Sequence, residues 1–188
     1  GQPRVASRPR ASGSSLLCVG IIEPRKNQLF LLESCIKLWN EGLSFDLHIV
    51  GRVNPHFGGP VVARIRALRK IYPGLHYHAA ADDAAVARLY AAARAAVFPT
   101  IAEGCGLPLI ESLWMGVPCV CSDLPVLREN ADGGGCLAVA PGDRAAWVLA
   151  LRRVLTEDAL VARLEAEATA RPLPTWAGAA QALLTVER

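Results

Sequence analysis

The amino-acid sequence predicts an α/β fold, a Rossmann-like parallel sheet of about six strands with helices on both faces. Short apolar runs alternate with segments of helical periodicity along the chain. These runs are continuously apolar, which is typical of parallel strands that are buried on both faces. A length of 188 residues, with 52% hydrophobic and 20% charged residues, fits one domain with a sizeable core and excludes a disordered chain.

The first half of the chain shows this alternation in order. Residues 15–20 form a short apolar run that ends in glycine. Four apolar residues at helical spacing follow within residues 27–39, namely Leu29, Leu32, Ile36 and Trp39. The same pattern then predicts further strands and helices in alternation: strands over residues 45–51, 75–79 and 95–99, and helices over residues 61–71 and 83–93.

The second half continues the pattern and then changes to helix alone. We expect a helix over residues 107–115, a strand over 118–122 and a last strand over 136–139, followed by helices over 145–155, 159–168 and 175–185. Residues 1–14 are rich in Pro, Gly, Ser and Arg, so we expect a linker before a domain of residues 15–188. In such a sheet ligands bind at the carboxyl ends of the strands, so function is sought in the loops that follow them.

Charge and cysteine content exclude several classes of protein. The 20 Lys and Arg against 17 Asp and Glu give a net charge of +3, and the basic residues are scattered, so we expect no nucleic-acid partner. The six cysteines contain no Cys-x-x-Cys pair and lie largely in apolar segments, which indicates reduced, buried thiols in a cytoplasmic protein and no zinc site. No apolar run approaches the roughly 20 residues that a membrane span needs.

The most informative segment runs from Pro99 to Glu111, between a predicted strand and a predicted helix. Gly104 and Gly106 allow a tight turn and the close approach of a ligand. Pro108 suits the first turn of a helix, because its missing N–H costs nothing there. The free amides and the dipole of a helix start form an anion site, so we expect a phosphate near Gly106 and Leu107.

Two carboxylates, Glu103 and Glu111, flank this expected anion site. A carboxylate near a phosphate needs donors of its own, and the vicinal diol of a sugar can give it two hydrogen bonds. Glu111 lies about one turn into the helix and could reach a ribose diol, while Glu103 could reach a group beyond the phosphates. The alternative is a glycine-rich connection with a solvated Glu103 and a Glu111 that only stabilises its helix.

A second candidate segment, residues 19–27, lies between the first predicted strand and helix and contains Gly20, Arg25 and Lys26. Two adjacent cations at a helix start oppose the helix dipole, and a bound anion would reverse that penalty. A diphosphate bridging this loop and the Glu103 segment is therefore one hypothesis. An ordinary solvated basic pair is the other.

The two segments together resemble the retaining GT-B glycosyltransferases, with their Glu-x7-Glu signature. The resemblance extends over about residues 16–186 and departs from the usual motif at Thr100, Cys105 and Ser112. It implies that Glu111 binds the ribose of a nucleotide-sugar and that Glu103 contacts the transferred sugar. It also implies that Gly20 and the segment Gly104, Cys105, Gly106 and Leu107 bind the donor. Lys26 and Arg25 would then neutralise its diphosphate and act with Glu103 as the catalytic groups.

The resemblance further implies that this chain is the C-terminal, donor-binding half of such an enzyme. The acceptor-binding N-terminal domain would then be absent from this chain, which alone would transfer little or nothing. The segment Glu-Pro-Arg-Lys-Asn at residues 23–27 is most similar to bacterial mannosyltransferases of polysaccharide biosynthesis. This similarity suggests GDP-mannose as the donor, with a UDP- or ADP-sugar as the alternative. No cofactor or metal is implied, and membrane association would come only through the absent domain or a lipid-linked acceptor.

Other interpretations of the same residues stay open. Gly104-x-Gly106 is part of the Gly-x-Gly-x-x-Gly pattern of dinucleotide-dependent oxidoreductases, but position 109 is leucine. A nucleotide-binding or interaction module of the same fold, without catalysis, is a third possibility. The resemblance also implies that the nucleobase lies near His78–Ala80, and an ordinary strand end with alternating hydrophobic residues is the alternative. We expect Asp82 and Asp123 to cap the helices that follow them.

Overall fold

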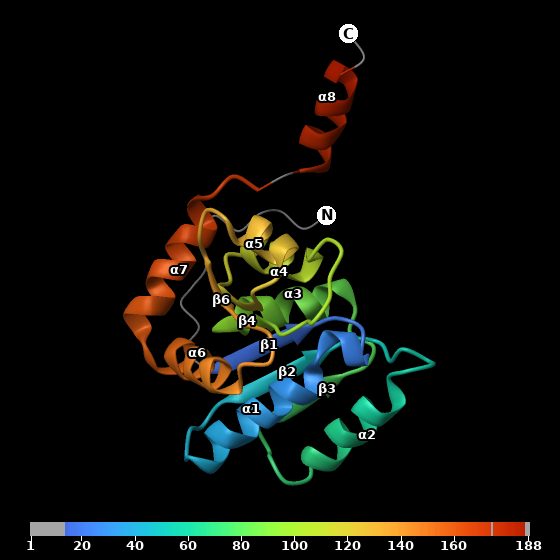
Figure 1. The fold of residues 1–188 in the computed structure, drawn as a ribbon, viewed down its shortest axis with the longest axis vertical. Helices are drawn as coiled ribbons and strands as arrows, with labels where there is room; N and C mark the ends of the chain where they lie inside the picture. Colours follow the sequence, from blue (N-terminus) through green and yellow to red (C-terminus); the bar gives the residue numbers. More distant parts are fainter. Residues whose placement is uncertain (1–13, 174, 187–188) are drawn as a thin grey trace.

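The computed structural model describes residues 14–173 and 175–186. The predicted fold class is confirmed: six strands pair in one parallel sheet in the order β3-β2-β1-β4-β5-β6 (Figure 1). The strands are β1 Ser15–Val19, β2 Asp46–Val50, β3 Leu75–His78, β4 Ala95–Phe98, β5 Cys119–Ser122 and β6 Cys136–Val139. The linker predicted for residues 1–14 falls, apart from its last residue, outside the described part of the chain.

Helices cover both faces of the sheet because neighbouring residues of each strand point to opposite sides. On one side Leu16 and Leu47 pack with α1 (Gln28–Asn40), α2 (Gly59–Leu68), α6 (Arg144–Thr156) and part of α7 (Asp158–Ala170). On the other side Leu17 and Ala96 pack with α3 (Asp83–Ala92), α4 (Leu107–Trp114) and α5 (Pro125–Ala131). In Figure 1 α8 (Trp176–Val186) stands apart from these layers. Within the described residues, no helix has the length and apolar character that a membrane crossing requires.

The element boundaries lie within one or two residues of those predicted for most of the chain, and α2 begins two residues early and ends three early. One capping prediction is confirmed and one is wrong. The Asp82 carboxylate accepts a hydrogen bond from the Ala85 amide at 2.7 Å and so caps α3. Asp123 does not cap α5, whose first flanking residue is Leu124; its carboxylate pairs instead with Arg128 of that helix.

The strand order creates one topological switch point. The chain passes from β1 outward to β2 and β3, and then returns to the other side of β1 as β4. The loops after β1 and β4 therefore lead to helices on opposite faces, and they leave a crevice between them at the carboxyl edge of the sheet. Both segments singled out in the sequence lie in these two loops.

Candidate functional site

The loop after β1 carries the two candidate cations. Pro24–Lys26 forms one 3-10 turn (η1), and Asn27, with a left-handed φ of 58°, leads into α1. The sequence places both cations at a helix start, where they would oppose the helix dipole. In the structure Arg25 and Lys26 instead form the last turn of η1, where positive charge is favourable. Lys26 is 9% exposed, and the carbon stem of its side chain lies against the backbone of Gly20.

The loop after β4 brings Glu103 directly to these cations. Lys26 Nζ donates to Glu103 Oε2 at 2.5 Å, and Arg25 Nη1 lies 3.5 Å from Glu103 Oε1. Lys26 Nζ also lies 4.9 Å from the centre of the Phe98 ring, a cation–π contact. Arg25 also forms an ion pair with Glu23, so the switch point holds a compact cluster of two cations and two carboxylates.

The ionisation of Glu103 follows from this pairing. Burial alone raises the pKa of Glu103, but the hydrogen bond and charge of Lys26, the Gly104 amide and the charge of Arg25 together outweigh it. The result is a pKa below the ordinary carboxyl value. Glu103 is thus a carboxylate at neutral pH, able to accept hydrogen bonds from hydroxyl groups but not to donate a proton.

Backbone hydrogen bonds fix the two loops against each other. The Ile101 amide donates to the Arg25 carbonyl at 3.0 Å, and the Asn27 side chain donates to the Pro99 carbonyl at 3.2 Å. The buried Thr100 hydroxyl lies within hydrogen-bond distance of the carbonyls of Arg25 and Ala102. The position of Lys26 relative to Glu103 is therefore set by the backbone as well as by their charges.

The glycine turn that follows Glu103 opens α4. Gly106 is the residue before the helix and has a left-handed φ of 75°, and the Leu109 and Ile110 amides bond to its carbonyl. The Asn130 side chain of α5 donates to the Cys105 carbonyl at 2.5 Å. Cys105 and Leu107 are exposed at this turn, and Leu107 is the first residue of the helix.

Replacing Gly106 by alanine is expected to destabilise the protein by about 2–3 kcal/mol. A Cβ at Gly106 would lie 2.6 Å from Leu127 Cδ2 and 2.9 Å from Asn130 Nδ2, in a backbone conformation that L-residues rarely adopt. Gly104→Ala is the matched control, because a Cβ there meets nothing within 4 Å. Urea unfolding of the two variants measures the difference, and equal stabilities would contradict the argument.

Glu111 lies in the second turn of α4, with an exposed side chain and no cation partner among the described residues. Desolvation by the surrounding protein raises the pKa of Glu111, and the charge of Asp83 at the start of α3 raises it further. Unlike Glu103, this carboxylate is thus left without local compensation. A bound ligand that supplied two hydroxyl donors would relieve that cost.

A cavity of about 480 Å³ lies beside the cations, at the carboxyl ends of β1, β2 and β3. Its lining includes Gly20, Gly51, Arg52, Ala79 and Ala80. The candidate base segment His78–Ala80 is therefore divided: the two alanines line the cavity, whereas the His78 ring hydrogen-bonds to His48 on the face of the sheet.

Three further residues shape the site, and the sequence analysis gives none of them a role there. Asn130 holds the glycine turn, and Glu23 forms an ion pair with Arg25 at 2.7 Å. Gly51 packs against Gly20 so closely that a Cβ would lie 1.9 Å from the Gly20 carbonyl oxygen. Gly51 has the signal of a glycine directly after a strand, Glu23 is part of the Glu-Pro-Arg-Lys-Asn segment, and Asn130 has no local signal.

The cysteines are free, as the sequence predicts. All six are unpaired, and four of them, Cys18, Cys35, Cys119 and Cys121, are buried. Burial raises the pKa of Cys18 to about 12, which keeps this thiol protonated and unreactive at neutral pH.

The sheet order and the two loops at its switch point define a Rossmann-like α/β domain. The chain belongs to the family described as Glycosyl transferases group 1, which matches residues 13–157. It is 34% identical over 121 residues, or 64% of its length, to the serotype-specific mannosyltransferase WbdA of Escherichia coli, of which this covers 15%. It is also 34% identical over 125 residues, or 65% of its length, to the O-antigen chain mannosyltransferase B of Escherichia coli, of which this covers 32%.

Solved GT-B glycosyltransferases share the fold. Sucrose-phosphate synthase of Thermosynechococcus elongatus superimposes with a TM-score of 0.80 at 25% identity, covering 95% of this chain and 45% of that one. HepE of Anabaena in complex with UDP superimposes with a TM-score of 0.71 at 16% identity, covering 85% of this chain and 44% of that one. The resemblance to this class is confirmed, and the chain spans less than half the length of these relatives.

Proposed function

We propose that this chain is the donor-binding half of a retaining glycosyltransferase that transfers mannose from GDP-mannose to an acceptor hydroxyl. The observation that carries the proposal is the meeting of the Lys26 and Glu103 loops at the switch point, beside the glycine-opened start of α4. Two cations, the amides at the start of α4 and a neighbouring cavity at the carboxyl edge of the sheet suit a nucleoside diphosphate. The mannosyltransferase relatives support the choice of sugar.

The surroundings of each side chain indicate its proposed role in binding the donor. Lys26, Arg25 and the start of α4 would neutralise the diphosphate, whose negative charge grows as the bond to the sugar breaks. Glu103, held ionised by Lys26, would accept hydrogen bonds from sugar hydroxyls and orient the reacting carbon. Glu111 would accept two hydrogen bonds from the ribose diol. The cavity lined by Gly51 and Ala80 would take the base.

The acceptor would be held by a second domain facing this crevice. Efficient transfer requires both reactants in one geometry, so this chain alone would bind donor but transfer little sugar. We expect negligible turnover of GDP-mannose by the isolated chain, measured as GDP release.

Calorimetry with nucleoside diphosphates tests the donor site directly. We expect the chain to bind GDP more tightly than UDP or ADP, and the melting temperature to rise with nucleotide concentration through mass action. GMP is the matched control ligand, because it lacks the second phosphate that Lys26 would contact. A folded protein that binds none of the three diphosphates would refute the donor site, and binding of NADH would favour an oxidoreductase.

A further inference from the structure

Three of the four histidines lie together near the β3 edge of the sheet, on the face that α3 and α4 also cover and outside the lining of the donor cavity. Parallel pairing sets His48 of β2 opposite His76 of β3, and Asp46 and His78 lie two residues away on the same side. Leu47 and Ile49, between them in sequence, point the other way into the core with α1 and α2. The cluster therefore gathers one carboxylate and three imidazoles at the edge of the sheet.

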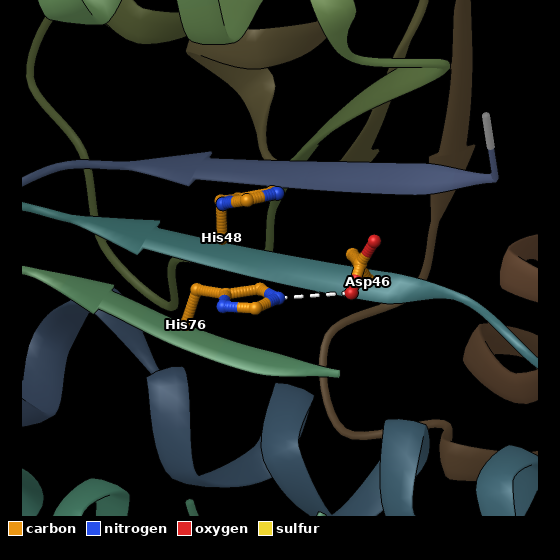
Figure 2. A group of neighbouring side chains, drawn as sticks. All are labelled: Asp46, His48 and His76. Atoms are coloured by element: carbon orange, nitrogen blue, oxygen red, sulfur yellow. Dashed lines mark hydrogen bonds and ion pairs between the residues drawn. The ribbon is translucent and has the colours of Figure 1, made fainter. Parts of the chain in front are cut away.

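The side chains converge at close range. Figure 2 shows the rings of His48 and His76 on neighbouring strands, with the His76 ring directed at Asp46. The two ring centres are 4.6 Å apart, and His76 Nε2 lies 2.9 Å from Asp46 Oδ1. One ligand atom from each of these three residues lies within 4.8 Å of the other two.

A fourth residue orients this set. His48 Nδ1 lies 3.1 Å from His78 Nε2, so these two nitrogens share one hydrogen bond. When His48 provides its proton, the other ring nitrogen of His48 is left with a free lone pair. A histidine that binds a metal commonly donates its second ring N–H in this way, and the partner fixes both the tautomer and the ring direction.

We propose that Asp46, His48 and His76 bind one divalent transition-metal ion of the zinc class, with His78 as a positioning residue. Zn–N and Zn–O bonds of about 2.0–2.2 Å put tetrahedral ligands roughly 3.4 Å apart, whereas the three donor atoms here lie within 4.8 Å of one another. Because the two imidazole rings are stacked, one of them must turn about its side-chain bonds so that both in-plane lone pairs point at one ion. Two imidazoles and one carboxylate favour Zn²⁺, Co²⁺ or Ni²⁺ over Mg²⁺ or Ca²⁺, which prefer oxygen ligands. Asp46 and His76 are part-exposed, which leaves water access to the fourth position.

The ion would tie the edge strand β3 to β2. The carboxyl ends of these two strands carry Gly51 and Ala79, which line the cavity of the proposed donor site. Metal binding is thus expected to stiffen the wall of that cavity formed by the ends of β2 and β3, without contact with a bound nucleotide. This proposal stands apart from the proposed function, because the ion would bind in the absence of any nucleotide.

Titration of the untagged, metal-free chain with Zn²⁺ and Co²⁺ tests the site. We expect one ion per chain by calorimetry, a melting temperature raised by several degrees, and the visible absorption of tetrahedral Co²⁺. Mg²⁺ at the same concentrations should change nothing. Absence of a tetrahedral Co²⁺ spectrum, or a thiolate-to-cobalt band that points to Cys105 instead, would overturn the proposal.

Variants assign the ion to these residues. His76→Ala and Asp46→Asn lie at part-exposed positions of the sheet edge, so they should fold, and each is expected to lower Zn²⁺ affinity at least about tenfold. His56→Ala is the matched control, because His56 is the remaining histidine and lies exposed in the loop after β2. The proposal would be overturned if His56→Ala lowered Zn²⁺ affinity as much as His76→Ala, or if both cluster variants kept full affinity. The hydrogen bond between His76 and Asp46 would then be a structural contact without a metal.

Discussion

Replacing Lys26 by alanine is expected to lower the affinity for GDP by roughly tenfold to a hundredfold and to destabilise the fold by about 2 kcal/mol. The loss of affinity follows from removing a nearly buried cation that would face the diphosphate. The loss of stability follows because Glu103 would keep its partly buried carboxylate without its closest donor. Calorimetry and urea unfolding measure the two effects separately.

The pH dependence of unfolding tests the predicted loss of the interaction between Lys26 and Glu103. The pKa of Glu103 is lowered in the folded protein, so its contribution to stability is present above the ordinary carboxyl value of 4.5 and is lost as the pH falls toward the lowered folded value. In Lys26→Ala this contribution is expected to shrink. Unfolding experiments at pH 7 and in the acid range should therefore show a smaller acid loss for the variant than for the natural chain.

A double-mutant cycle separates the pair from its surroundings. Glu103→Ala removes the partner, and Lys26→Ala with Glu103→Ala removes both, so the coupling energy isolates the interaction of the two side chains. Lys37→Ala is the matched control, because Lys37 of α1 forms an exposed ion pair with Glu41, the residue after that helix. A coupling energy near zero, together with unchanged GDP affinity in Lys26→Ala, would contradict both the pairing and its role.

The fold could be predicted from the sequence because its central strands, β1, β4 and β5, are buried on both faces. Runs such as those of β1 and β5 are apolar except for one terminal serine each, Ser15 and Ser122, and a run of this kind has few alternatives to a parallel strand once helices flank it. Element ends were less predictable, since they depend on backbone caps. The 3-10 turn of Pro24–Lys26 is fixed by contacts to the Glu103 loop that lie 77 residues away in sequence.

The candidate site could be predicted in part for the same reason. Glycines, a proline and carboxylates around the start of α4 carry a local signal, so Glu103, Gly106 and Glu111 stand out. The pairing of Lys26 with Glu103, and the bond from Asn130 to the Cys105 carbonyl, join segments distant in the chain. Only the strand order brings these residues together, and no local spacing records it.

Replacing Glu111 by alanine is expected to weaken GDP binding by roughly a hundredfold, because two charge-assisted hydrogen bonds to the ribose diol would be lost. The same change is expected to leave the unliganded fold as stable or slightly more stable at neutral pH. The pKa of Glu111 is raised by desolvation and by Asp83, so its ionised form costs stability that appears as the pH rises above the ordinary carboxyl value. Because the side chain is exposed, this gain should be small.

A loss of GDP affinity without a loss of stability distinguishes a carboxylate that binds ligand from one that only stabilises the fold. If Glu111 only stabilised its helix, its removal would lower the melting temperature and leave GDP affinity unchanged. Glu129→Ala on α5 is the matched control, since Glu129 is an exposed helical glutamate next to the same turn. It should change neither quantity, and an equal loss of GDP affinity in both variants would mean that general electrostatics, not a diol contact, explains the effect. Repeating the titration with 2′-deoxy-GDP would then isolate the diol, because the natural chain should lose affinity with this ligand while Glu111→Ala should not.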